Sequence, residues 1–311
     1  MIYSNWKSWS TAWNTFWFSK QAPETLGLIR ILAGSMLFYT HLVWATGGRG
    51  FFGPDGILPE SYRRELNGAG DWAWSHFDWL PSEAWLPAAH IIALLVIASF
   101  TLGFRTRICG ILSWLIVISY ANRTNGAQFG LDQVNTFLAL YLAIGNSGSA
   151  YSIDRWLQNR AKSKSGLADE ESILTNIAIR LIQVHLCVVY LFAAIGKAQG
   201  TSWLNGEAIL MALSSYEYQS LDMVWLVHHM WLVNLATLIS FFWELGYAAL
   251  IWPKLTRPIF LGIAIGVHLG IGLAMGMLTF GLIMIYANLA FIPPATIRSC
   301  ANRWLPGAAN G

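Results

Sequence analysis

Polar residues that interrupt the apolar segments are the first candidates for chemistry. Asn176, Gln183, Tyr190 and Lys197 follow one another at intervals of seven residues, which keeps them on one slowly drifting stripe of a helix. Lys197 ends this stripe, just past the apolar run VVYLFAAIG. An ammonium in apolar surroundings loses hydration, which favours its neutral form and lets it act as a base. A more common role for a lysine at this position is structural: the Lys197 side chain extends its ammonium into the membrane interface.

Asp132 and His268 are candidates for supporting roles, and His185 is a second histidine within the predicted spans. Asp132 falls at the external end of its apolar run, at a height similar to that of Lys197. A carboxylate too close to Lys197 would favour the charged ammonium and oppose the base. The two histidines both fall near mid-membrane and could touch, although a lone intramembrane histidine is more often a hydrogen-bonded core residue than a ligand.

Charged residues inside the predicted spans need partners, because an unpaired charge in hydrocarbon is costly. Counting along the helices places Arg180 roughly 10 Å and Glu244 roughly 12 Å from the inner ends of their spans. Arg30 lies at a comparable depth, so we expect an Arg30, Arg180 and Glu244 cluster in the inner half of the membrane. The favoured interpretation is structural: the cluster locks three helices together.

Composition excludes several classes of protein. Of 311 residues, 55% are hydrophobic and 11% charged, whereas a soluble domain has roughly 25% charged residues. Seventeen Trp and eleven Tyr are typical of aromatic belts at membrane interfaces. The net charge of +3 has no clustered basic face, so nucleic acid is not an expected partner. The three cysteines form no CxxC pair, and the adjacent His228 and His229 lack the i, i+4 spacing of a helical metal pair, so no metal site is indicated.

Eight apolar runs of spanning or near-spanning length predict an all-α fold, a bundle of about eight transmembrane helices. The runs are 26–45, 86–104, 108–121, 131–145, 173–195, 231–252, 258–276 and 278–293. Two of them, 108–121 and 131–145, are shorter than the usual twenty or so residues. Within 258–276, a GxxxGxxxG ladder of Gly262, Gly266 and Gly270 indicates close helix packing.

An amphipathic segment precedes the first span. Aromatic residues recur there at helical spacing with polar residues between them: Trp6, Trp9, Trp13, Phe16 and Trp17. This pattern is typical of a helix that lies in the interface, and a helix packed against the bundle would show it too. The predicted organisation is an interfacial segment at 1–22, a transmembrane domain at 23–295 and a short cytoplasmic tail at 296–311.

The distribution of Lys and Arg predicts the orientation. With the N-terminus in the cytoplasm, twelve of these residues outside the spans fall inside and five outside. Cytoplasmic loops carry the excess of basic residues, so both termini are expected in the cytoplasm and Lys197 at the external side. No basic region followed by a short apolar run and a cleavage site begins the chain, so a removable signal peptide is not expected.

Several segments together carry a family resemblance. They are LGLIRILAGSMLFYTHLVW, LGFRTR, NRTNGAQFGLD, YLFAAIGKAQGTSWLNGEAI, FFWELGY and GVHLGIGLAMGM. These segments resemble the HTTM family, the transmembrane module shared with vitamin K-dependent gamma-carboxylase, over nearly the whole chain. In the carboxylase stretch that aligns with the fourth of them, an apolar run leads to a catalytic lysine, followed by Trp and Gly. Lys197, Trp203 and Gly206 match this stretch.

The resemblance implies that Lys197 is a catalytic base at the external side. In the family, the lysine deprotonates a reduced quinone, which reacts with oxygen to give a base strong enough to remove a glutamate γ-proton before carbon dioxide adds. A vitamin K-like quinol is therefore the cofactor that the resemblance implies, with Trp203, Tyr190 and His185 as candidate contacts. Two departures stand out: the assisting histidine of the carboxylase aligns only with the Asp132 region, and its large C-terminal lumenal region has no counterpart after the last span. Carboxylation of a protein substrate is therefore not expected.

The sequence thus favours a carboxylase-like membrane enzyme, which the resemblance would class as a lyase. Lys197 would act as the base on a quinol-like or other lipid-soluble substrate, and Asp132 and His268 would assist. The alternative is a non-catalytic module that binds lipid or assists a partner. A transporter is less favoured because no repeated halves are visible. Membrane lipids are the expected surroundings, and the resemblance implies a bacterial inner membrane.

Overall fold

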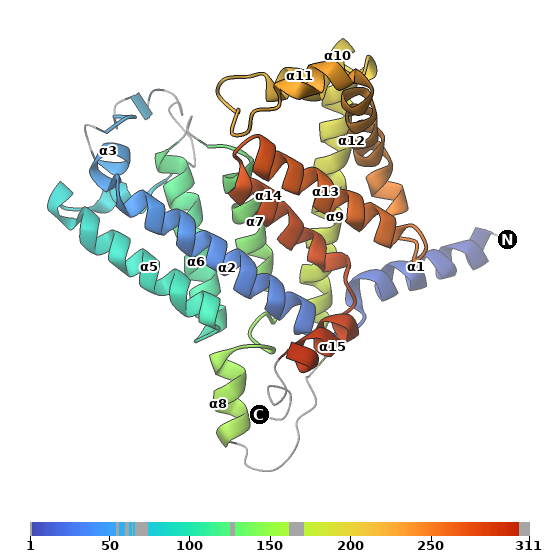
Figure 1. The fold of residues 1–311 in the computed structure, drawn as a ribbon. Coiled ribbons are helices and arrows are strands. Elements are labelled where there is room, and N and C mark those ends of the chain that lie inside the picture. The colour runs from blue at the N-terminus through green and yellow to red at the C-terminus, as the bar shows by residue number, and fades with distance from the viewer. Residues whose placement is uncertain are drawn as a thin grey trace. The chain divides into compact units, whose positions relative to one another are not determined.

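The computed structural model describes residues 2–53, 56–59, 62–63, 65, 74–124, 128–161 and 171–304, with the side chains of 2–7 and 304 left out. Residues 305–311 of the predicted tail lie outside the described residues. Within these ranges the regular structure is helical (Figure 1). The β-type pairing there is an isolated antiparallel bridge between Gln21 and Ser172. The predicted all-α class is confirmed.

The chain divides into two compact units. The first comprises Met1–Arg180 and Ile292–Gly311, and the second Leu181–Phe291. The helices of the first unit are α1 (Ile2–Phe18), α2 (Glu24–Ala45), α3 (Gly48–Phe52), η1 (His76–Trp79), η2 (Glu83–Trp85), α5 (Leu86–Leu102), α6 (Thr106–Arg123), α7 (Gly130–Ile144), α8 (Ile153–Ala161) and α15 (Pro294–Trp304). Helix α9 (Ile173–Ala198) begins in the first unit and continues into the second.

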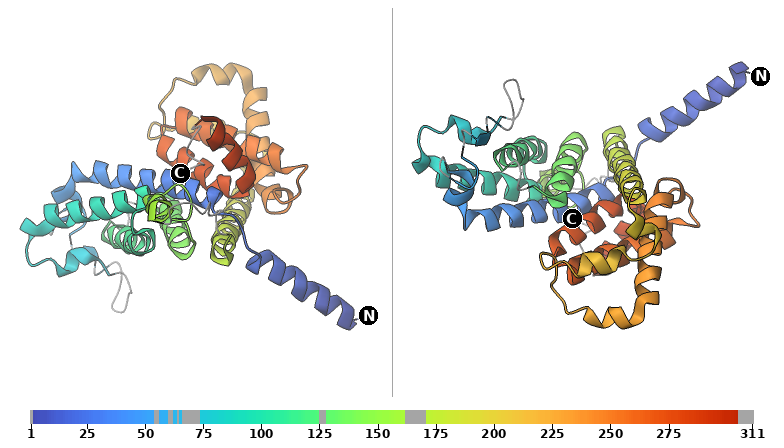
Figure 2. Two further views of the ribbon diagram at one scale, coloured as in Figure 1. Left: turned by 90° about the horizontal axis from the view of Figure 1, so that it is seen from below. Right: turned by 90° about the horizontal axis from the view of Figure 1, so that it is seen from above.

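Four helices form the body of the first unit. Helix α2 packs against α5 and α7, and α6 packs against α5 and α7, so the four lie side by side in the views of Figures 1 and 2. Each contributes one buried residue to a shared apolar cluster: Leu37, Ile97, Val117 and Ala139. Because lipid is as apolar as these side chains, close van der Waals packing rather than removal of apolar surface from water holds the helices together.

The turn between α5 and α6 is fixed by a left-handed glycine and a carboxylate. Gly103 ends α5 with φ +74°, and a Cβ there would lie 2.4 Å from the Ser152 Cβ. Asp154 accepts hydrogen bonds from the backbone N–H groups of Arg105 (2.9 Å) and Thr106 (2.8 Å) and from the Thr106 hydroxyl (2.7 Å). A carboxylate at a helix N-terminus satisfies free N–H groups and interacts favourably with the helix dipole.

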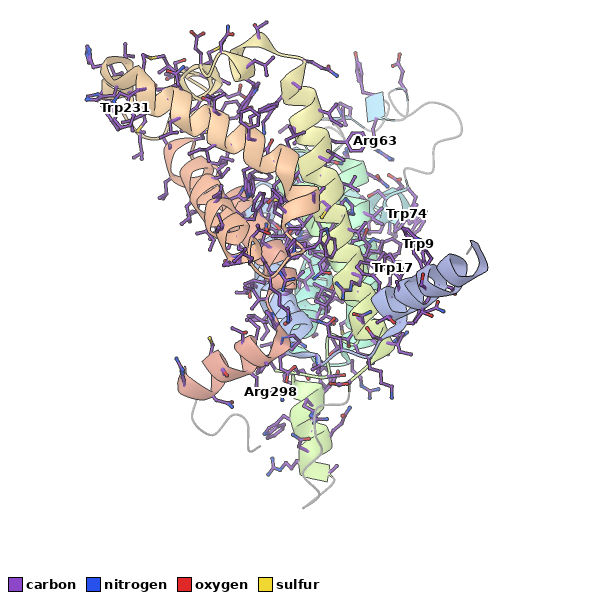
Figure 3. All side chains as sticks on the ribbon, turned by 90° about the vertical axis from the view of Figure 1, so that its right-hand side faces the viewer. Trp9, Trp17, Arg63, Trp74, Trp231 and Arg298 are labelled. Carbon is purple, nitrogen blue, oxygen red and sulfur yellow. The ribbon has the colours of Figure 1, made fainter. Side chains whose placement is uncertain are left out.

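The N-terminal helix is tied to the first unit by its last turn. Asn176 Nδ2 donates to the backbone oxygens of Phe16 (2.8 Å) and Trp17 (2.9 Å). Closer to the N-terminus of α1, Trp9 and Trp13 are 75% and 63% exposed. Figure 3 labels Trp9 and Trp17 on this helix. Exposed indole rings are what an interfacial helix requires, and the interfacial role of segment 1–22 stays a prediction.

The second unit contains the end of α9 and the helices that follow it. These are α10 (Thr201–Leu204), α11 (Ala208–Leu213), η3 (Val224–His229), α12 (Met230–Leu250), α13 (Arg257–Ala274), α14 (Leu278–Asn288) and η4 (Leu289–Phe291). Helices α13 and α14 approach closely at Gly281, where a Cβ would lie 2.3 Å from the His268 backbone oxygen. By contrast, no described atom lies within 4 Å of a Cβ built on Gly262, Gly266 or Gly270. The predicted glycine ladder therefore does not form this packing contact, which uses Gly281.

Five helices among the described residues are long and apolar enough to cross a membrane. They are Glu24–Ala45, Glu83–Leu102, Ile173–Ala198, Val224–Leu250 and Arg257–Ala274. A sixth candidate is the pair Leu278–Phe291 and Pro294–Arg303, bent by 113°. The predicted count of about eight is not confirmed. Helix α6 is less apolar than the five helices named above. The 15 residues of α7 give about 22 Å of helix, which is shorter than a hydrocarbon core of about 30 Å.

Candidate functional site

Lys197 and Glu244 form an ion pair in the second unit. Lys197 lies one residue before the end of α9, and its Nζ donates to both carboxylate oxygens of Glu244 on α12. The two side chains are 23% and 9% exposed. Because Nζ contacts both oxygens, the carboxylate is held in one orientation toward the ammonium.

An indole ring lies against the same ammonium. After α9 ends, Gly200 leads into the short helix α10, which places the Trp203 ring centroid 4.7 Å from Lys197 Nζ. The face of an indole attracts a cation by about 0.5–2 kcal/mol, depending on desolvation. Lys197 is therefore held between a carboxylate and an aromatic face.

A second polar group lies within the same unit and involves Tyr190, seven residues before Lys197 on α9. The Tyr190 hydroxyl lies 2.8 Å from His268 Nε2 on α13 and accepts a hydrogen bond of 3.0 Å from Asn288 Nδ2 on α14. Asn288 Nδ2 also donates to the Met284 backbone oxygen, and Asn288 Oδ1 accepts from the Tyr247 hydroxyl at 2.6 Å. The network thus connects four helices.

These hydrogen bonds assign the protons of the network. The Asn288 amide is oriented by its bond to a carbonyl oxygen, so its N–H donates to Tyr190 and the Tyr190 proton is available to His268 Nε2. The neutral His268 ring then carries its own proton on Nδ1. His268 is 3% exposed, and its Nδ1 is buried without a hydrogen-bond partner. A buried unpaired donor costs about 1–3 kcal/mol, so Nδ1 marks a position that a ligand oxygen would satisfy.

The ion pair and the hydrogen-bond network belong to one site. Trp243, which precedes Glu244 on α12, lies against the His268 ring with ring centroids 6.2 Å apart. The same indole packs edge-on against Tyr190 with ring centroids 4.8 Å apart. The site is therefore a proton-carrying cluster enclosed by aromatic rings, in which low polarity strengthens each electrostatic interaction.

The structure brings together four residues that the sequence singled out: Lys197, Trp203, Tyr190 and His268. Three other members were not predicted: Asn288, Tyr247 and Trp243. Asn288 interrupts the apolar run 278–293, and this signal, a polar side chain within a span, could have found it. Tyr247 and Trp243 carry no comparable signal, because aromatic residues are abundant throughout the chain.

Glu244 has a partner that counting along the helices did not give. The sequence placed it at the depth of Arg180, whereas the structure pairs it with Lys197, roughly 25 Å farther along α9 than Arg180. In the first unit, Arg180 packs over the Phe16 ring at 4.3 Å and donates to the Phe16 backbone oxygen. The cluster of Arg30, Arg180 and Glu244 stays a prediction. Glu244, its carboxylate, forms its ion pair with Lys197 in the structure.

Arg30 is fully buried in the first unit. Its guanidinium donates to the backbone oxygens of Ser147, Ala150 (3.3 Å) and Tyr151 (2.5 Å), just after the end of α7. These oxygens belong to the loop between α7 and α8, and buried backbone oxygens outside regular structure need donors. Arg30 therefore fixes the loop that follows α7, which is a structural task.

The remaining predicted residues have local surroundings of their own. In the first unit, Asp132 lies in the first turn of α7 and accepts a hydrogen bond of 3.1 Å from the Phe129 backbone N–H, which caps the helix. His185 lies on the part of α9 in the second unit and is half-buried. The assisting role of Asp132 and the quinol contact of His185 stay predictions. Among the described residues, no group of three or more His, Cys, Asp or Glu is placed to hold a metal ion.

Comparison with known proteins gives one match. The model of the HTTM domain matches residues 18–295, nearly the whole chain. No curated protein and no solved structure matches the chain. With its set of apolar helices long enough to span a membrane, the chain is an integral membrane protein, and it belongs to the HTTM domain family.

Proposed function

We propose that this protein is a membrane enzyme that removes a proton from a lipid-soluble, quinol-like substrate, with the Lys197 and Glu244 pair as the base. The observation that carries the proposal is the pair itself, held against Trp203 at the end of α9. A carboxylate in contact with an ammonium favours its charged form. The proton acceptor is therefore the pair rather than Lys197 alone.

The net charge before and after proton transfer supports the pair as the base. An ammonium and a carboxylate together carry no net charge, and uptake of one proton converts the pair to an ammonium and a carboxylic acid with net charge +1. The substrate that lost the proton carries −1, so the complex of site and substrate stays neutral overall. Charge separation in an apolar site is costly, and an anion formed beside the ammonium is stabilised where it develops.

The neighbouring residues fit a substrate that carries an acidic hydroxyl group on an aromatic ring. His268 Nδ1 is a buried donor without a partner and would hold a substrate oxygen. Trp203 and Tyr190 offer aromatic surfaces beside the pair. A reduced quinone would supply the acidic hydroxyl, as the family resemblance implies. His185 remains a proposed contact of the quinol.

The proposed location follows from the distribution of basic residues and from the resemblance. It is a bacterial inner membrane with both termini in the cytoplasm, and membrane lipids surround the apolar helices. Lys197 then lies near the external surface, where its side chain is 23% exposed. A proton released from the pair can reach water from this position.

The test uses the full chain in lipid vesicles with a reduced naphthoquinone as probe. The measurement is oxygen-dependent consumption of the quinol, corrected for the rate in empty vesicles. We expect Glu244→Gln to lower the protein-dependent rate at least tenfold at equal folded concentration, because the amide keeps the shape of the side chain but cannot take up the proton. An unchanged rate in Glu244→Gln would refute the base role of the pair.

A second candidate function is a non-catalytic module that binds lipid or assists a partner. The observation that favours it is that the same ion pair joins α9 to α12 and thereby has a structural explanation. This candidate predicts that wild-type protein consumes no quinol above the vesicle background. It also predicts that Lys197→Arg has no phenotype beyond a small change in stability.

A further inference from the structure

A small cavity in the first unit has none of the residues of the proposed base in its lining. It has a volume of about 10 Å³ and is lined by α2, α6 and α7. This volume is about that of one water-sized molecule. Its polar lining residues are Thr40, His41, Asp132 and Asn135, and the rest of the lining is Leu37, Trp44, Val117 and Ala121.

His41 presents a hydrogen-bond acceptor at this cavity. Its Nδ1 lies 2.8 Å from the Leu37 backbone oxygen, which can only accept, so Nδ1 carries the proton. Nε2 of the neutral ring is then an acceptor. The residue is 1% exposed, and its Nε2 is buried with no hydrogen-bond partner among the residues that the structure describes.

The other polar groups around the cavity also offer acceptors. Asn135 is 2% exposed, and its Oδ1 is a second buried atom without a partner. The Thr40 hydroxyl donates its proton to the Leu37 backbone oxygen at 2.9 Å, which leaves only lone pairs. The Asp132 carboxylate accepts from the Phe129 N–H and has further acceptor capacity. Two unsatisfied acceptors at one cavity require an occupant that donates at least twice.

We propose that this cavity binds one small molecule or ion that donates hydrogen bonds to His41 Nε2 and Asn135 Oδ1, either a water or an ammonium ion. A hydroxyl group of a larger ligand donates once and would not satisfy both acceptors. The occupant removes the cost of two buried unpaired acceptors. It also connects α2, which carries His41, to α7, which carries Asn135.

The first test is a double-mutant cycle on thermal unfolding of the full chain in detergent. His41→Phe keeps the ring packing on Tyr120 (4.6 Å between centroids) and removes the acceptor, and Asn135→Leu removes the other at similar volume. With the donor bound, we expect each variant to lower Tm by about 2–4 °C, and the double variant to lower it by less than the sum. Ser113→Ala is the control, because Ser113 Oγ is a buried unpartnered atom away from this cavity and its removal should leave Tm unchanged or raise it.

An empty cavity reverses the expected sign, because each substitution then replaces an unsatisfied acceptor with an apolar group. If His41→Phe and Asn135→Leu leave Tm unchanged or raise it, as Ser113→Ala does, the proposal is overturned. If His41→Phe fails to fold, the wild-type protein decides: an experimental structure at water-resolving resolution should show a peak within hydrogen-bond distance of both atoms. Absence of that peak overturns the proposal as well.

The second test separates the two occupants. Tm of wild-type protein is measured against increasing ammonium chloride, with sodium chloride at matched ionic strength as the control. A saturable rise with ammonium, abolished in Asn135→Leu, identifies an ammonium site. Equal curves in the two salts, together with the coupled destabilisation above, identify a water. Neither result depends on quinol turnover, so the outcome is independent of the proposed enzyme activity.

Discussion

Removal of Glu244 tests how the second unit accommodates its charges. In Glu244→Gln the shape of the side chain is kept, and the Lys197 ammonium loses the carboxylate that contacts it through both oxygens. Breaking a fully buried pair costs about 3–5 kcal/mol, whereas exposed pairs contribute about 0.2–1 kcal/mol. Glu244 is 9% and Lys197 23% exposed, which places this pair nearer the buried limit. The Trp203 ring remains as a partner for the cation and offsets part of the loss.

We therefore expect Glu244→Gln to lower the free energy of unfolding by about 2–3 kcal/mol. Lys197→Met should cost less, about 1–2 kcal/mol, because the isolated carboxylate can take up a proton and become neutral. The double variant Lys197→Met with Glu244→Gln buries no charge and should be more stable than Glu244→Gln alone. The expected coupling energy is at least about 1.5 kcal/mol.

The assay is thermal melting in detergent micelles for the four proteins of the cycle, where 1 kcal/mol corresponds to about 2–4 °C. Lys197→Arg serves as the control, since it retains an ion pair with Glu244 and should melt within about 2 °C of wild type. Additive effects of the two single substitutions would refute the reasoning. Such a result would mean that the two charges are hydrated separately in solution.

Three further predictions concern other parts of the chain. Burial alone would raise the pKa of Asp154, but hydrogen bonds from Thr106 and Arg105 hold it below its ordinary value of 3.8. The stabilisation is therefore fully present above about pH 3.8 and is lost as pH falls below it, so Tm of wild type should fall there more steeply than Tm of Asp154→Asn. Asn176→Ala removes both hydrogen bonds to the last turn of α1 and should increase proteolysis within α1, measured by mass spectrometry, with about 1–2 kcal/mol of local destabilisation. Gly281→Ala places a Cβ 2.3 Å from the His268 backbone oxygen and should cost about 1–3 kcal/mol by overpacking; equal melting of this variant and wild type would contradict the close approach of α13 and α14.

The sequence predicted the membrane class and part of the site for physical reasons that differ between residues. A seven-residue interval places Tyr190 and Lys197 on one side of α9 whatever their neighbours are, so their association with one site was predictable. The partner of Glu244 was not, because counting along a helix gives a depth only if each span crosses at the same tilt and height, and packing decides both. His41 is an ionisable residue within the run 26–45, a signal that marks its position but gives no partner. Its unsatisfied Nε2 becomes visible only once three helices close around a cavity.

The contact with Glu244 also changes what a base at Lys197 would mean. A lysine that acts alone needs its neutral form, and a carboxylate beside it works against that form. If Lys197 alone were the base, Glu244→Gln would free the amine and raise turnover of the quinol or leave it unchanged. If the pair is the base, the carboxylate takes the proton while the ammonium stabilises the anion of the substrate, so Glu244→Gln should abolish turnover, whereas Lys197→Arg keeps a cation beside the carboxylate and should retain much of it. If Lys197 alone were the base, Lys197→Arg would abolish turnover. Rates of these two variants, measured at equal folded concentration, therefore distinguish a desolvated lysine from a paired one.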